Sequence, residues 1–308
     1  ADIDMAAQRL SGAILAQEVI GIATDYDMDG LGAHATFRMA LVQMLGHPAQ
    51  RLRSYIGHRL AEGYGLTQAV ANRVLQDHPR PSVLVTADNG SSDELRIAQL
   101  QAAGIDVIVT DHHELPEEGL PRSAYACVNP QRDDCEYPDK AIAGGMVLWL
   151  LLRAVRKILI EVDYAPARSA RLETLLDYVA CSTVADCVSM ASHNNRAIVQ
   201  AGLAQMNALR RPCWQVMQRR LQVREFESRS IAFGIAPRVN ARSRLADPFA
   251  ALHFLLARDQ KSAEAALHVL EVENSARKQI EAQMIGDALE RAARQVTDGR
   301  QSITLVLP

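Results

Sequence analysis

The chain has 308 residues, of which 48% are apolar, 22% charged and 5% aromatic, and its net charge is −3. This length and apolar content suffice for a buried core and for more than one folded unit. The weak negative charge argues against a protein that coats nucleic acid by bulk charge, so we expect any nucleic-acid contact in a local groove.

Apolar strands alternate with amphipathic helices through the first two thirds of the chain. We expect strands at 18–25, 82–90, 105–113 and 124–131, with helices at 30–46 and 91–104. This alternation is typical of a parallel sheet that is covered on both faces. The sequence therefore predicts a doubly wound, mainly parallel α/β domain over residues 1–205.

Strand patterns are scarce in the remaining third. Residues 206–300 predict a helical region, in which 261–296 read as one long connecting helix. The segment 302–308 has the pattern of a new strand, so we expect 301–308 to begin a second domain. The chain opens with Ala1 and no initiator methionine, and we expect it to be a fragment of a longer protein.

Cysteine use and hydropathy bear on the cellular compartment. The five cysteines form no C-x-x-C pair, and their odd number favours reduced thiols in a cytoplasmic protein. No apolar run reaches the roughly 18 residues that a membrane span requires. We expect no association with a membrane.

Acidic and histidine residues follow the predicted strands. Asp25, Asp27 and Asp29 come after the first strand and Asp88 after the second, while Asp111, His112 and His113 come after the third. A further apolar stretch at 175–188, which we counted with these strand ends, carries Asp186. Ligands of doubly wound sheets bind beyond the carboxyl ends of the strands. We therefore expect these four segments to meet at one edge of the sheet.

Crowded carboxylates repel one another unless a cation lies among them. Oxygen ligands with one or two histidines suit magnesium or manganese. Two such ions about 3.5–4 Å apart activate water and hold both the attacking and the leaving oxygen in phosphoryl transfer. We therefore predict a centre for two Mn²⁺ or Mg²⁺ ions.

Each of these segments also has a simpler interpretation. The pattern D-x-D-x-D-G matches half of a calcium-binding loop, but Ala35 and Thr36 lie where its glutamate would follow. Asp88 could form an Asx turn, and Asp186 could cap a helix. The coincidence of all four segments favours metal binding.

Four motifs carry a resemblance to a known family. "TDYDMDG", "TADNGSS", "VIVTDHH" and "STVADCV", in this order, resemble the motifs of the DHH phosphoesterase superfamily. "GHRLAEGYGL", "AGGMVLWLLL", "NNRAIVQAGL" and "IAPRVNARSRL" are similar to segments of the RecJ-type single-stranded-DNA-specific 5′→3′ exonucleases. RecJ-type chains continue beyond the point matching Pro308 into a second domain.

The resemblance implies roles for individual residues. Five match the metal ligands of the family: Asp27, Asp29, Asp88, His112 and Asp186. Among them Asp88 would bridge the two ions. Asp25 and Asp111 match acidic residues that orient the ligands, and His113 matches a histidine that faces the scissile phosphate.

Basic and aromatic residues supply candidate contacts to DNA. Arg59, Arg238, Asn240 and Arg244 are placed to bind backbone phosphates, because guanidinium groups pair with phosphate oxygens. Tyr64 is a candidate for stacking on a base. The alternatives are an internal salt bridge for Arg238 or Arg244 and turn packing for Tyr64.

The resemblance implies a two-metal exonuclease that hydrolyses single-stranded DNA to 5′-mononucleotides in DNA repair and recombination. It also implies single-strand-binding protein and a RecQ-type helicase as partners. Two alternatives stay open: a DHH phosphodiesterase for short oligonucleotides or cyclic dinucleotides, and an inactive DHH-fold scaffold at the replication fork.

Overall fold

A five-stranded sheet forms the centre of the computed structural model, which describes residues 1–242, 249–297 and 304. Its strands lie in the order β2-β1-β3-β4-β5, and each neighbouring pair is parallel. They are β1 (Ile20–Thr24), β2 (Leu52–Ile56), β3 (Val83–Ala87), β4 (Asp106–Thr110) and β5 (Ala126–Val128). The predicted parallel α/β fold is confirmed.

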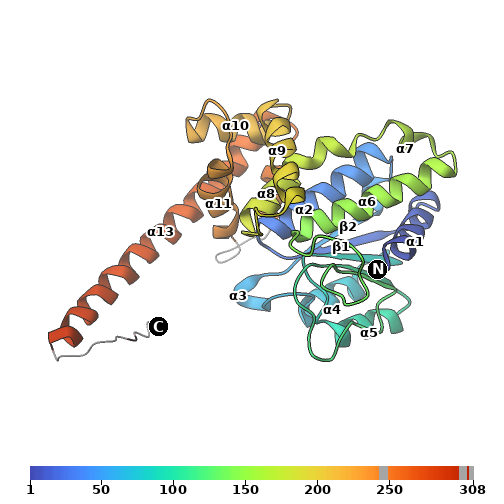
Figure 1. The fold of residues 1–308 in the computed structure, drawn as a ribbon, viewed down its shortest axis with the longest axis horizontal. Helices are drawn as coiled ribbons and strands as arrows, with labels where there is room; N and C mark the ends of the chain where they lie inside the picture. Colours follow the sequence, from blue (N-terminus) through green and yellow to red (C-terminus); the bar gives the residue numbers. More distant parts are fainter. Residues whose placement is uncertain (243–248, 298–303, 305–308) are drawn as a thin grey trace.

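Helices cover both faces of this sheet (Figure 1). The larger core lies under α1 (Ile3–Leu15), α2 (Met28–Arg38), α6 (Gly144–Glu161) and α8 (Leu176–Ala185), and the smaller core lies under α4 (Gln68–Gln76) and α5 (Glu94–Ala102). Successive strand residues point to opposite faces. Val85 therefore joins the larger core while its neighbour Leu84 joins the smaller one.

Strand β2 was not predicted. It lies at the edge of the sheet, and two of its five residues, Arg53 and Ser54, are only partly buried. A half-exposed edge strand has no continuous apolar run, so its sequence lacks the pattern by which we predicted the other strands.

The predicted helix at 30–46 begins earlier and changes its winding. α2 starts at Met28 and continues without a break into a π-helical turn, η1 (Met39–Met44). The side chain of Asp27 caps α2 by accepting hydrogen bonds from the backbone N–H groups of Asp29 and Gly30. The helix end therefore fixes the first acidic segment.

The stretch 175–188 is largely helical and not a further strand, so counting it with the strand ends was wrong. A 3₁₀ turn, η3 (Leu172–Leu175), leads into α8. The first eight residues of α8 are all buried. A helix buried on every side shows no amphipathic period, so its pattern resembles that of a buried strand. Asp186 is the C-cap residue of α8.

The part of the chain after residue 206 is helical, as predicted, where the structure describes it. The long helix α13 (Gln260–Thr297) extends away from the rest of the molecule (Figure 1). It is preceded by α10 (Pro212–Leu221), α11 (Ala236–Arg242) and α12 (Phe249–Leu255). Two further helices, α7 (Ala165–Ser169) and α9 (His193–Asn207), flank α8 along the chain. Three short segments complete the described elements: η2 (Ala49–Arg51), α3 (Arg59–Glu62) and the π turn η4 (Ser230–Ile235).

The expected strand at 302–308 lies outside the described residues except for residue 304. The domain boundaries at 205 and 300 stay predictions. Among the helices that the structure describes, none is both long and apolar enough to cross a membrane.

Candidate metal centre

The register of the sheet brings three acidic residues side by side. Thr24 pairs with Ala87, and Ala87 pairs with Thr110, at the ends of β1, β3 and β4. The residues that follow these three are all aspartates: Asp25, Asp88 and Asp111. Strand order reverses between β1 and β3, which is where doubly wound folds place their ligands.

Asp88 has an unusual backbone conformation. Its φ angle is 64°, in the left-handed region that residues other than glycine rarely adopt. Its backbone N–H donates to the carbonyl oxygen of Thr110, and its side chain is almost fully buried. Aspartate tolerates this conformation better than most residues, and such strain clusters at functional sites.

The acidic and histidine side chains converge into three groups that could hold a metal ion. Within each group the ligand atoms lie within 4.8 Å of one another. The groups are Asp29, His112 and Asp186; Asp25, Asp27 and Asp88; and Asp88, His112 and His113. Asp88 and His112 each belong to two groups, so the three form one continuous centre.

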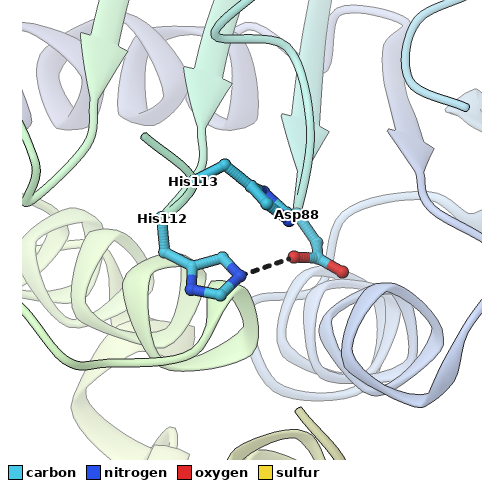
Figure 2. Close-up of side chains that lie close together, drawn as sticks. All are labelled: Asp88, His112 and His113. Carbon is cyan, nitrogen blue, oxygen red and sulfur yellow. Dashed lines mark ion pairs between the residues drawn. The ribbon is translucent and has the colours of Figure 1, made fainter. Parts of the chain in front are cut away.

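This convergence includes all five residues that we predicted as ligands. It also includes Asp25, to which we had given only an orienting role. Figure 2 shows Asp88 and the two histidines, with Nε2 of His112 at 3.1 Å from Oδ1 of Asp88. Whether these side chains bind metal stays a prediction.

Burial makes the uncompensated carboxylates unfavourable in their charged form. It raises the pKa of Asp25 to about 8, with a further contribution from the charge of Asp27. Burial likewise raises the pKa of Asp186 to about 6 and that of Asp88 above its usual range. The common cause is loss of hydration of a charged group.

Three buried atoms of the centre make no hydrogen bond with a described residue, although two of them, Nε2 of His112 and Oδ1 of Asp88, lie 3.1 Å from each other. They are Oδ1 of Asp25, Oδ1 of Asp88 and Nε2 of His112. Buried polar atoms are normally satisfied, and these are carboxylate and imidazole atoms of the type that bind Mn²⁺ or Mg²⁺. The residues present therefore fit divalent ions, which would neutralise the carboxylates and occupy the unused lone pairs.

Asp29 is held by the first turn of α6. Its two carboxylate oxygens accept hydrogen bonds from the backbone N–H groups of Gly144 and Gly145, both at 2.7 Å. Helix N-termini favour negative charge. A side chain at Gly144 would place its Cβ 2.8 Å from Cβ and Oδ1 of Asp88, and one at Gly145 would lie 2.4 Å from Oγ of Ser182. Close approach therefore requires both glycines.

Asp111 organises the histidine pair. Its Oδ1 lies 2.7 Å from Nδ1 of His113 and accepts from the backbone N–H of His112 at 2.8 Å. Burial is the largest influence on its pKa and raises it, but the hydrogen bond and charge of His113 together with hydrogen bonds from Ser91 outweigh burial, and the net shift is downward. The hydrogen bond with Asp111 raises the pKa of His113. Among the described residues Asp111 belongs to none of the metal-capable groups, and its orienting role stays a prediction.

Tyr64 reaches the same histidine. Its hydroxyl group lies 3.2 Å from both ring nitrogens of His113 and donates to the carbonyl oxygen of Asp88 at 3.2 Å. The residue is 52% exposed. Tyr64 was a candidate for stacking on a base or for turn packing. The structure places its hydroxyl group at the metal centre, and stacking stays a prediction.

Unlike the predicted metal ligands, the residues predicted to contact DNA do not form one cluster in the described part of the chain. The guanidinium group of Arg59 is exposed and lies 5.5 Å from the ring centroid of Tyr26, beside the acidic loop. Arg238 is buried and forms a salt bridge with Glu271 at 2.6 Å, which is the alternative left open above. Asn240 accepts a hydrogen bond from the backbone N–H of Met28 at 2.8 Å. Arg244 lies outside the described residues.

Two functional contributions were missed because each involves a backbone N–H group. The N–H groups of Gly144 and Gly145 hold the predicted ligand Asp29, and the N–H group of Met28, next to the predicted ligand Asp27, is held by the side chain of Asn240. The adjacent glycines at the start of an apolar helix were the available signal. The glycine pair alone did not indicate that its N–H groups would bind the side chain of Asp29.

Comparisons with known proteins agree with this geometry. The model of the DHH family, N-terminal domain, matches residues 19–183, which is more than half of the chain. The chain is 34% identical to a single-stranded-DNA-specific exonuclease RecJ from Dickeya dadantii, covering 99% of this chain and 52% of that protein. It is 32% identical to the protein of that name from Escherichia coli K12, covering 92% of this chain and 50% of the relative.

A solved structure is similar over most of the chain. The crystal structure of exonuclease RecJ bound to manganese matches with a TM-score of 0.81 and 28% sequence identity, covering 94% of this chain and 70% of that one. The chain spans about half the length of the curated relatives it matches.

Proposed function

The chain belongs to the DHH family, and on that premise we propose that it is a metal-dependent nuclease of RecJ type. It hydrolyses phosphodiester bonds from the 5′ end of single-stranded DNA and releases 5′-mononucleotides in DNA repair and recombination. The observation that carries this proposal is the convergence of seven aspartate and histidine side chains at one edge of the sheet, three of whose buried atoms make no hydrogen bond with a described residue. The named relatives supply the substrate class.

The residues proposed to hold two Mn²⁺ or Mg²⁺ ions are Asp27, Asp29, Asp88, His112 and Asp186. Asp88 is proposed to bridge them, because it takes part in two of the ligand groups. When bound, such ions lower the pKa of water and neutralise charge that develops on the phosphate oxygens.

The residues of the chain would orient the substrate around this centre. Asp111 engages Nδ1 of His113 and fixes the ring. Nε2 of His113, which lies 3.2 Å from the hydroxyl group of Tyr64, would bind a non-bridging phosphate oxygen when the substrate displaces that hydroxyl group. Arg59, at the exposed rim, would bind a neighbouring backbone phosphate. Asp25 lies close enough to Asp27 and Asp88 to share ligand duty or to orient them.

Arg238 and Asn240 are proposed to act on DNA through the loops that they hold. Arg238 has its charge paired with Glu271, and Asn240 is bonded to the backbone of Met28. Direct phosphate contacts by these two and by Arg244 stay predictions. Partnership with single-strand-binding protein and a RecQ-type helicase, and a cytoplasmic location, are proposed from the same likeness.

The test compares substrates in Mn²⁺. The chain is given a 5′-labelled single strand, the same strand in a blunt duplex, and a dinucleotide. We expect mononucleotides from the single strand, little product from the duplex, and none with Asp88→Ala, whose fold is checked by circular dichroism. Preferred cleavage of the dinucleotide would favour the small-substrate alternative, and no cleavage of any substrate by the wild type would favour the scaffold.

A further inference from the structure

A second cavity lies at the opposite end of α2 from the metal centre. It has a volume of about 680 Å³ and is bounded by the C-terminal end of α2, the turn η1, helix α12 and the start of α10. Arg38 is the last residue of α2 and lies nine residues after Asp29. At 1.5 Å per residue, the two residues are about 14 Å apart along the helix axis. The cavity is therefore separate from the proposed ligands.

The charge on its walls has one sign. Four arginines line it: Arg38, Arg210, Arg211 and Arg258. Among the described residues no aspartate or glutamate lines it. In the described part of the chain, Arg211 is the one of the four with a carboxylate partner: its Nε lies 2.5 Å from Oδ2 of Asp177.

The positive charges of Arg38 and Arg258 repel each other, and no described carboxylate pairs with either. Burial, and then the positive charge of Arg258, lowers the pKa of Arg38 from its usual value. Neither forms an ion pair with a described residue. An anion that contacts both guanidinium groups would offset their repulsion and form charge-assisted hydrogen bonds with each.

The rest of the wall is apolar and includes an aromatic ring. Met39, Val42, Leu252 and Phe249 contribute to it, next to the arginines. Small-ligand sites typically enclose about 300–1,000 Å³ and combine apolar walls with a few placed polar groups. The adjoining π turn η1 is an uncommon conformation that is frequent at functional sites.

We propose that this cavity binds a nucleotide, with its phosphate group between Arg38 and Arg258 and its base or sugar against the apolar wall. Planar guanidinium groups match phosphate oxygens in paired hydrogen bonds. The nucleotide is either a free mononucleotide or one unit of a single strand, since both present the same chemistry. The cavity thus provides a nucleotide site that needs none of the metal ligands.

The test is calorimetric titration of the whole chain in EDTA, so that divalent ions do not contribute. The probes are thymidine 5′-monophosphate, thymidine, and a ten-residue oligothymidylate with a 5′-hydroxyl end. The variants are Arg38→Gln and Arg258→Gln. Arg294→Gln, on the distal end of α13, removes the same charge far from the cavity and serves as the matched control.

We expect thymidine 5′-monophosphate to bind, and thymidine to bind at least about tenfold more weakly. Each cavity variant should lose about tenfold or more in affinity, the size typical of a lost charge-assisted hydrogen bond, and the control should lose none. If only the oligothymidylate binds with this dependence, the natural source of the phosphate is the strand. Arg258 is exposed, so Arg258→Gln remains informative if Arg38→Gln fails to fold.

Equal affinities for all variants with both phosphate-bearing probes would overturn the proposal. Measurable binding of thymidine with the same affinity as its monophosphate would overturn it as well. Because no turnover is measured, these outcomes are independent of whether the chain is a nuclease.

Discussion

Replacing Gly144 with alanine tests how closely the metal centre depends on its backbone. The added Cβ would lie 2.8 Å from Cβ and Oδ1 of Asp88 and 2.9 Å from its Cα. Carbon atoms pack best at about 3.5–4.0 Å, so helix α6 or Asp88 must move by roughly 0.7 Å or more. A change of rotamer does not relieve the contact with Cα, so the displacement reaches the backbone that positions this carboxylate.

The expected effect on activity is large and the effect on stability is small. A misplacement of about 1 Å at a reacting centre costs on the order of a hundredfold in rate. Overpacking costs about 1–3 kcal/mol, part of which alanine offsets through its better helix propensity. Gly144→Ala should therefore stay folded by circular dichroism, with Mn²⁺-dependent cleavage of a single strand reduced about a hundredfold.

Gly12→Ala is the matched control. Gly12 is exposed in α1, and nothing lies within 4 Å of the Cβ that alanine would add. This variant should keep full activity and gain about 1 kcal/mol in stability. Wild-type cleavage rates in Gly144→Ala would refute the claim that close approach of α6 to Asp88 shapes the site.

Three further predictions follow from buried or bridging side chains. Arg238→Ala should lower the free energy of unfolding in urea by about 1.5 kcal/mol, because Glu271 loses one charge-assisted hydrogen bond but keeps its salt bridge with Arg220; an unchanged midpoint would contradict this. Burial lowers the pKa of His34 to about 3, below the unfolded value of about 6.5, so the unfolded state binds the extra proton in this window. His34 should therefore lower the stability by about 1.4 kcal/mol per pH unit as the pH drops from about 6 to about 3, whereas the raised pKa values of Asp25 and Asp186 act in the opposite direction. The difference in stability between wild type and His34→Gln, from urea titrations at several pH values, should show the slope of His34. Tyr64→Phe should lower kcat about tenfold at nearly constant KM, because it removes the hydroxyl group beside His113; unchanged kcat would favour a stacking role, which phenylalanine preserves.

The sheet and the acidic cluster were predictable because their signals are local. β1, β3 and β4 are buried apolar runs, and an aspartate follows each one directly. Parallel pairing then brings those aspartates together without further information.

Tertiary context decided what the sequence left open. α8 is buried on all sides, so nothing in its pattern separated helix from strand. The partners of Arg238 and Asn240 lie 33 and 212 residues away along the chain, and no short motif reveals such contacts. Glycines 144 and 145 act through backbone N–H groups that every residue except proline possesses.

Anomalous diffraction at the manganese edge, from crystals of the chain grown with Mn²⁺, tests the central claim most directly. The account predicts two peaks among Asp27, Asp29, Asp88, His112 and Asp186, with Asp88 next to both. No peak at these side chains, or peaks only elsewhere on the molecule, would contradict it.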